Sequence, residues 1–315
     1  MAKFVAARLI DAIPVLLLSS LLVFLILHLV PGDPIDAMMG AASFGISTPE
    51  SQAKLVAEIR AQLGLNDPLP LQYLHWLGNA LRLDFGESFI RHQPVATLIA
   101  QRLPSTLELA GTALLLSVIL GMSFGIIAAL RRNTWVDGAV MVVSLAGVSI
   151  PSFAFAMLLI LLFSVTLGWL PATGSGSFDR LILPALVLGY EGTGLIARLT
   201  RASLLEVLGR EYMTTARAKG LPPRILILRH ALRNALIPIV TIVGLQVGRL
   251  LAGSIIVETV FARQGVGQLA IDAILQKDYP LVQGIILLTA SAYVIANLFV
   301  DISYGFINPK IRTAS

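Results

Sequence analysis

Residues 107–130 read LELAGTALLLSVILGMSFGIIAAL, a run of 24 positions in which Glu108 is the one charged residue. A helix of about 20 mainly apolar residues is long enough to cross the hydrocarbon core of a bilayer. The rest of the chain agrees, because 56% of its 315 residues are hydrophobic and 13% are charged. A soluble domain carries about 25% charged residues. The sequence therefore predicts an all-α membrane protein and excludes a water-soluble domain.

Five further apolar stretches bring the predicted number of transmembrane helices to six. The first stretch is too long for the apolar part of a signal peptide, and no cleavage-type site follows it, so we expect it to stay as a span. The six predicted spans are residues 12–30, 107–130, 139–167, 181–197, 236–259 and 281–304.

The chain divides by composition into four predicted parts. Residues 1–30 hold the N-terminal end and the first span, and residues 31–103 hold twelve charges with several Pro and Gly. This second part is expected to be an extracytoplasmic segment with a short helix within residues 48–63. Residues 104–305 form a core of five spans, and residues 306–315 form a tail.

The lysines and arginines predict the orientation. Fourteen lie on the side of the two termini, against three in the short loops of the other side, Arg180, Arg263 and Lys277. Short cytoplasmic loops carry an excess of Lys and Arg. Both termini are therefore expected in the cytoplasm, and the net charge of +5 indicates membrane topology rather than nucleic-acid binding.

Catalytic and metal-binding motifs are missing from the sequence. There is no cysteine, none of the five lysines is followed by Ser or Thr as a P-loop requires, and no histidine is followed by Glu as in a zinc protease. We expect no catalytic site, no metal site and no bound cofactor.

Three pairs of small residues, each spaced four apart, predict close packing between helices. Small residues at this spacing let two backbones approach each other in a membrane. The pairs are Gly121 with Gly125, Gly189 with Thr193, and Gly244 with Gly248.

Residues 198–235 form the most informative loop of the chain. Residues 198–233 carry eight of the 23 basic side chains. Residues 206–219 are predicted to form one amphipathic helix, with Gly220 suited to the C′ position and Pro222-Pro223 to the first turn of a second helix. An ordered helix–turn–helix on the cytoplasmic side favours a docking site for a protein partner. The simpler reading is the charge bias of any cytoplasmic loop.

The residues of this loop resemble a known family. The strings EYMTTARAKGL at 211–221 and RHALRNALIP at 229–238 are similar to the EAA loop of ABC transporter permeases, in the version of the peptide/nickel importer group with dipeptide and oligopeptide permease B. Further matching strings are PGDP at 31–34, LGLNDP at 63–68, DFGES at 84–88, PSTLEL at 104–109, ETVF at 258–261 with GVG at 265–267, and DYP at 278–280.

The resemblance implies a type I ABC importer permease fold in a bacterial inner membrane. The chain would form half of a transmembrane pathway, paired with a second permease in a heterodimer. ATP would be bound by two separate ATPase subunits, and a periplasmic or lipid-anchored binding protein would deliver the substrate. The positions expected to couple to an ATPase subunit are Glu211, Thr214, Thr215, Ala216, Arg217, Lys219, Gly220, Leu221 and Arg233.

Two departures from the wider family occur within the loop. Thr214 and Thr215 stand where a Glu and an Ala are common, and Arg233 stands where a Pro is expected. These departures fit the peptide-type subgroup, and they leave no acidic contact at position 214.

Polar residues inside the predicted spans are candidates for the substrate pathway or its gate, because ionisable groups are costly there. They are Glu191, Gln246, Arg249 and Glu258. The alternative for Glu191 and Arg249 is an ion pair between helices or subunits, and the alternative for Gln246 is a structural hydrogen bond.

The expected substrate is a dipeptide or oligopeptide. Nickel chelates and glutathione are alternatives on the same scaffold, since selectivity resides mainly in the binding protein. An ion-driven secondary transporter is the competing class, and it would transport without any ATPase.

Overall fold

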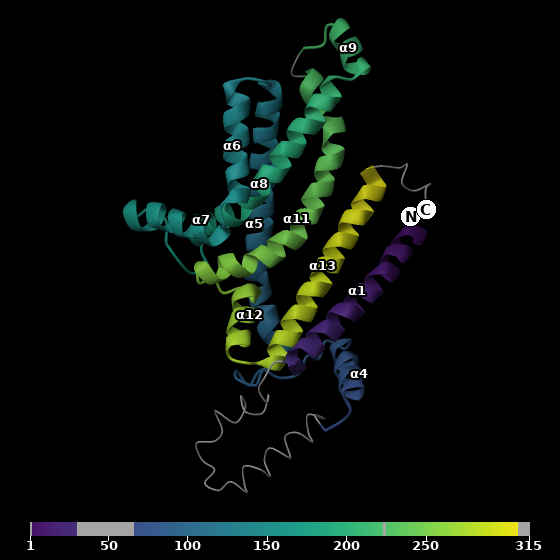
Figure 1. Cartoon of the computed structure of the whole chain (residues 1–315), viewed down its shortest axis with the longest axis vertical. Coiled ribbons are helices and arrows are strands. Elements are labelled where there is room, and N and C mark those ends of the chain that lie inside the picture. The colour runs from purple at the N-terminus through teal and green to yellow at the C-terminus, as the bar shows by residue number, and fades with distance from the viewer. Residues whose placement is uncertain (1, 30–65, 223–224, 308–315) are drawn as a thin grey trace. The chain divides into compact units, whose positions relative to one another are not determined.

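The computed structural model describes residues 2–29, 66–222 and 225–307, so the helix predicted within residues 48–63 lies outside the described part. The described residues are mainly helical (Figure 1). In chain order the elements are α1 (Ala2–Leu29), α4 (Leu69–Ala80), α5 (Val95–Leu130), α6 (Trp135–Ser149), α7 (Ser152–Leu159), the π-helix η2 (Ile160–Thr166), α8 (Asp179–Leu208), α9 (Glu211–Ala218), the π-helix η3 (Leu226–Ala231), α11 (Leu232–Val260), α12 (Val266–Leu275) and α13 (Tyr279–Ile307).

The chain divides into two compact units. The larger unit holds residues 1–6, 105–264 and 295–315, and the smaller unit holds residues 7–104 and 265–294. The long helix α5 passes from one unit to the other at Pro104, and α13 does so after Val294.

Four helices of the described part are long and apolar enough to cross a membrane. They are α5, α8, and the segments Pro238–Val260 of α11 and Tyr279–Leu298 of α13. A fifth span results if α6 and the run Ser152–Thr166 are counted as one broken span, whereas the apolar part of α1, Leu9–Leu25, is shorter. The number of six spans therefore remains a prediction.

The stretch predicted as one span at residues 139–167 is bent in the structure. The axes of the two halves differ by 109°. The break lies at Ile150 and Pro151, where Ile150 is extended at φ −92° and ψ 125°. Proline has no N–H to donate, and its ring disfavours the helical conformation of the residue before it. Apolar composition predicts burial in lipid but carries no information on this bend.

Close packing of backbones holds the larger unit together around α8. A Cβ atom on Gly125 of α5 would lie 2.5 Å from the carbonyl oxygen of Ala197, and one on Gly194 of α8 would lie 2.3 Å from that of Ser144 on α6. Gly121 and Gly189 make similar close approaches between α5 and α8. The predicted packing of small residues is thus confirmed for the first two pairs.

The smaller unit has its own apolar core. Phe85, Val95 and Ile99 pack there with Leu269 of α12 and Leu281 of α13. On the other side of α4, the ring of Tyr73 meets that of Phe24 on α1 edge to face, with centroids 5.5 Å apart. These contacts join segments that are far apart in the sequence.

Candidate functional site

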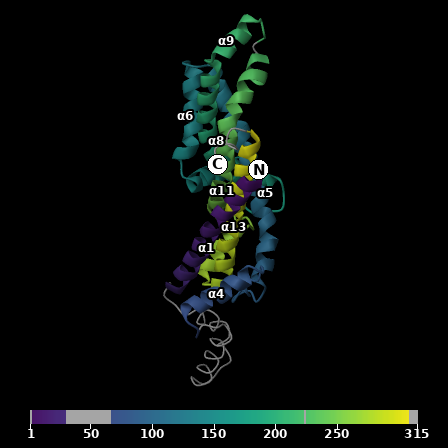
Figure 2. The ribbon, with the colours of Figure 1, turned by 90° about the vertical axis from the view of Figure 1, so that its right-hand side faces the viewer.

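The short helix α9 lies beyond the ends of α8 and α11 (Figures 1 and 2). The predicted helix at residues 206–219 was wrong in its start: α8 runs on to Leu208, and α9 begins at Glu211. The break comes from Arg210, which is extended at φ −75° and ψ 147°. Gly209 before it ends α8, because glycine is a poor helix former.

One side of α9 packs on the protein and the other side is open. Met213 is completely buried, in a cluster with Leu204 and Val207 of α8, Ala231 of η3 and Ala235 of α11. Ala216 and Leu221 are half-buried. The remaining predicted coupling residues are exposed, namely Glu211, Thr214, Thr215, Arg217, Lys219, Gly220 and Arg233. The open face is therefore polar and of mixed charge.

Gly220 ends α9 in the left-handed conformation that was predicted for it. Its φ is +76°, a value that glycine adopts without a steric penalty. After α9 the carbonyl oxygen of Pro222 accepts hydrogen bonds from the backbone N–H groups of Ile225 and Leu226. From Ile225 the chain continues through η3 into α11 without a break. The helix α9 is connected to these elements by packing, since Met213 contacts residues of α8, η3 and α11.

An ion pair joins α6 to α8 near the same end. Nε of Arg201 lies 2.7 Å from Oδ1 of Asp137, and Nη2 lies 2.6 Å from Oδ2. The side chain of Asp137 is 9% exposed, and it also accepts a hydrogen bond from the backbone N–H of Asn133. A second pair, Arg210 with Glu206, is exposed, and the carboxylate of Glu206 raises the pKa of Arg210.

The three polar candidates midway along α8 and α11 have different environments. Gln246 is 4% exposed and its Nε2 lies against Gly192, where a Cβ atom would be 2.3 Å away. Glu191 and Arg249 are both exposed. Within the described residues no ion pair joins them, so the alternative of an interhelical pair within this chain finds no support.

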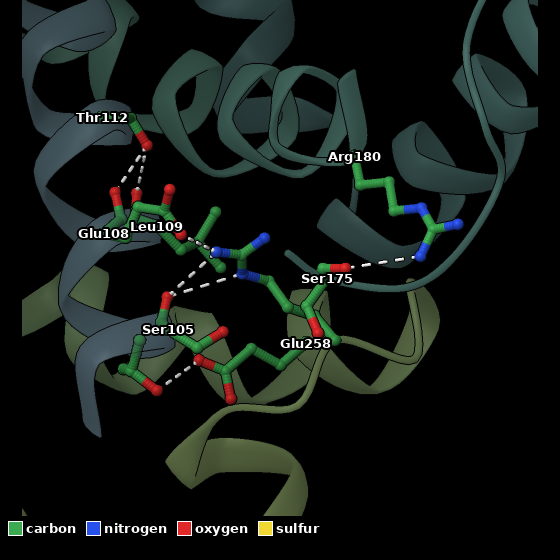
Figure 3. Close-up of polar contacts among 9 residues, drawn as sticks. Ser105, Glu108, Leu109, Thr112, Ser175, Arg180 and Glu258 are labelled. Carbon is green, nitrogen blue, oxygen red and sulfur yellow. Dashed lines mark hydrogen bonds and ion pairs between the residues drawn. The ribbon is translucent and has the colours of Figure 1, made fainter. Parts of the chain in front are cut away.

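The fourth candidate, Glu258, belongs to a polar cluster between α5 and the end of α11, in which Glu108 is exposed (Figure 3). Glu258 is completely buried and accepts a hydrogen bond of 2.7 Å from Thr106 Oγ1. Arg263, 1% exposed, pairs with Glu108 and donates to the carbonyl oxygen of Ser105. The similarity strings PSTLEL and ETVF thus meet in space, and a role of Glu258 in the pathway or its gate stays a prediction.

Sequence reasoning missed four charged residues that the structure brings together. Glu108 was noted as the one charge in a span and Arg263 as a loop cation, whereas Asp137 and Arg201 were not singled out. One signal was present for Asp137, since it is the one acid among residues 131–137. The partner of each residue lies more than 60 positions away, so no local pattern identifies it.

Comparison with known proteins decides the family. The sequence profile of the binding-protein-dependent transport system inner membrane component matches residues 121–313, and its N-terminal companion profile matches residues 1–110. The chain belongs to this family. The permease is 46% identical over 312 residues to the glutathione transport system permease protein GsiC of Escherichia coli strain K12, and equally to that of Shigella dysenteriae, with 99% of each chain covered.

Solved structures show the fold of the permease independently. It is similar to a chain of the MetNI methionine ABC transporter in an inward-facing conformation, with a TM-score of 0.57 and 19% identity, over 67% of the permease and 96% of that chain. A chain of an amino acid ABC transporter with histidines gives a TM-score of 0.50 at 16% identity, over 68% and 94%. The predicted type I ABC importer permease fold is therefore confirmed.

Proposed function

We propose that the permease forms half of the transmembrane pathway of an ABC importer for glutathione or a similar short peptide. The observation that carries this proposal is the 46% identity to glutathione permeases over 99% of both chains. Those relatives favour glutathione over the broader expectation of dipeptides and oligopeptides and over nickel chelates. Glutathione is itself a small peptide, so the two expectations are close in chemistry.

The proposal assigns the energy source to other subunits. Two ATPase subunits bind ATP, and one of them docks on the open face of α9 from the cytoplasm, where both termini of the permease also lie. A second, homologous permease completes the pathway, and a binding protein delivers the substrate from outside. The polar, exposed face of α9 and the packing of Met213 against residues of α8, η3 and α11 support this arrangement.

Reconstitution in proteoliposomes tests the proposal. The permease is reconstituted with its cognate second permease, the ATPases and the binding protein. We expect this complex to take up labelled glutathione only when ATP is present on the side of the membrane that the ATPases face. Uptake by the permease alone would show an ion-driven or passive transporter and would overturn the proposal.

The variant Gly220→Asp tests the docking face. Its side chain adds a negative charge to that face, and an L-residue at φ +76° is strained. We expect an assembled complex that hydrolyses ATP while glutathione uptake falls on the order of tenfold, which corresponds to a loss of about 1.4 kcal/mol of coupling. Gly209→Ala is the matched control, because Gly209 has φ −84° and room for a methyl group. Normal uptake by Gly220→Asp would refute the docking role.

A further inference from the structure

Glu191 and Arg249 lie at the same height on two packed helices. Leu188 of α8 contacts Gly253 of α11, since a Cβ atom added to Gly253 would lie 3.1 Å from Cδ1 of Leu188. Four residues along α8, Gly192 contacts Gln246 of α11. Contacts at 188 with 253 and at 192 with 246 show that the two helices run antiparallel here. Glu191 lies between Leu188 and Gly192 on α8. Arg249 lies between Gln246 and Gly253 on α11.

Both charges sit far from the ends of apolar helices. Arg249 is eleven residues from each end of the segment Pro238–Val260, and Glu191 is twelve residues from the start of α8. A charge at this depth is costly in a membrane, and such residues usually face a protein interior or a water-filled path. At this depth, each of the two charges is expected to have a polar neighbour.

The two side chains also leave the helix pair on the same face. Gly189 of α8 packs against Ala113 of α5, and Glu191 is two residues further, or about 200° around the helix. Glu258 of α11 bonds to Thr106 of α5, and Arg249 is nine residues before it, or about 180° around. Glu191 and Arg249 therefore both point away from α5.

Neither charge has a partner in the part of the permease that the structure describes. Both side chains are exposed, and no hydrogen bond or ion pair is formed by either one within that part. The buried residues beside them, Gly192 and Gln246, carry no charge, and no ion pair to either charge is formed within the described residues. A carboxylate and a guanidinium are thus both exposed at a similar position along the two helices.

We propose that Glu191 and Arg249 form a site for a zwitterionic peptide on its way through the pathway. The carboxylate of Glu191 accepts hydrogen bonds from the substrate's ammonium group, and the guanidinium of Arg249 donates two parallel hydrogen bonds to a substrate carboxylate. The substrate class is a short peptide with a free ammonium group and a free carboxylate, which includes glutathione. This inference rests on the proposed function and adds the substrate contact to it.

The test uses the complete transporter in proteoliposomes, with glutathione delivered by its binding protein. Glu191→Gln and Arg249→Gln keep the size of each side chain and remove its charge. Each variant is expected to lower the maximal uptake rate about tenfold, since a hydrogen bond to a charged group is lost. The concentration of loaded binding protein that gives half-maximal uptake is expected to stay unchanged, because docking of the binding protein is a separate step.

Two further variants separate substrate contact from structural pairing. The exchange of both charges, Glu191→Arg with Arg249→Glu, is expected to leave uptake low, because the substrate then meets the wrong charge at each end. The matched control is Asp179→Asn in the first turn of the same helix as Glu191, an exposed carboxylate outside the proposed site, which is expected to behave as wild type.

Each contrary result has a defined meaning. Uptake restored by the double exchange would show that the two residues pair with each other, and loss of the second permease on purification of a single variant would show a pair between subunits. Either result, or wild-type uptake by both single variants, overturns the zwitterion site. If the wild-type transporter itself takes up no glutathione with ATP, the proposed function fails and the site fails with it.

Discussion

Gly194 shows how a single hydrogen atom in place of a side chain sets the distance between two helices. A Cβ atom at this position would lie 2.3 Å from the carbonyl oxygen of Ser144, a backbone atom that can move only with α6. Gly138 on α6 is also helical, and a Cβ atom there would meet nothing within 4 Å. Two glycines of similar helical context thus have opposite steric surroundings.

We predict that Gly194→Ala destabilises the permease and Gly138→Ala does not. Overpacking a close contact costs about 1–3 kcal/mol, because the helices must separate. Gly138→Ala is expected to stabilise α6 by about 1 kcal/mol without a clash, because Ala has a higher helix propensity than Gly. Thermal unfolding in detergent is the measurement, with a lower Tm expected for Gly194→Ala alone. Equal Tm values would mean that α6 and α8 do not approach closely.

At the scale of elements, the Asp137–Arg201 pair ties the start of α6 to the part of α8 that leads to α9. The pair is bidentate and its carboxylate is largely buried, whereas Glu206 and Arg210 form a pair with side chains 68% and 56% exposed. Exposed pairs contribute about 0–1 kcal/mol. Removing one partner of a buried pair costs about 3–5 kcal/mol, because a charge is left without compensation.

Asp137→Ala is therefore expected to destabilise the permease by about 3 kcal/mol, near the lower end of that range because Arg201 is 27% exposed. Glu206→Ala, the matched exposed acid, is expected to change stability by less than about 1 kcal/mol. Denaturant unfolding followed by tryptophan fluorescence measures both. If Glu206→Ala lowered the free energy of unfolding as much as Asp137→Ala does, the stronger role given to the buried pair would be contradicted.

At the scale of the whole molecule, each compact unit is closed by polar contacts between distant segments. In the smaller unit Asp278 is completely buried and accepts hydrogen bonds from Ser88 Oγ and from the backbone N–H of Phe89, 3.2 Å away. The similarity strings DFGES and DYP, 190 residues apart, thus meet just before α13. This contact holds the turn at residues 84–94 on the α12–α13 junction.

Asp278→Ala is predicted to release this turn, at a cost of about 1–3 kcal/mol for the donors left without an acceptor. Hydrogen exchange read by mass spectrometry should then show faster exchange at residues 88–95. Asp84→Ala provides the control, since Asp84 is an exposed carboxylate that bonds only locally to Gly86 N–H among the described residues. Unchanged exchange in Asp278→Ala would show that the turn is held by its apolar contacts.

The sequence by itself determined the membrane class, the apolar helices and the family, because these depend on composition, run length and local strings. It also predicted the left-handed stop at Gly220, which needs no distant residue. Helix ends were predicted less well: the apolar window ended at Ala197, yet α8 continues to Leu208 because backbone hydrogen bonds in a helix do not require apolar side chains.

Only the tertiary structure decided which charges are paired and which are free. Asp137 with Arg201, Glu108 with Arg263, and Ser88 with Asp278 are separated by 64 to 190 positions, and their pairing follows from how the helices pack. The same packing leaves Glu191 and Arg249 exposed at one height, with no ion pair to either one among the residues that the structure describes. The physical reason is that an electrostatic contact depends on distance in space and on burial, and neither quantity is written in the order of the residues.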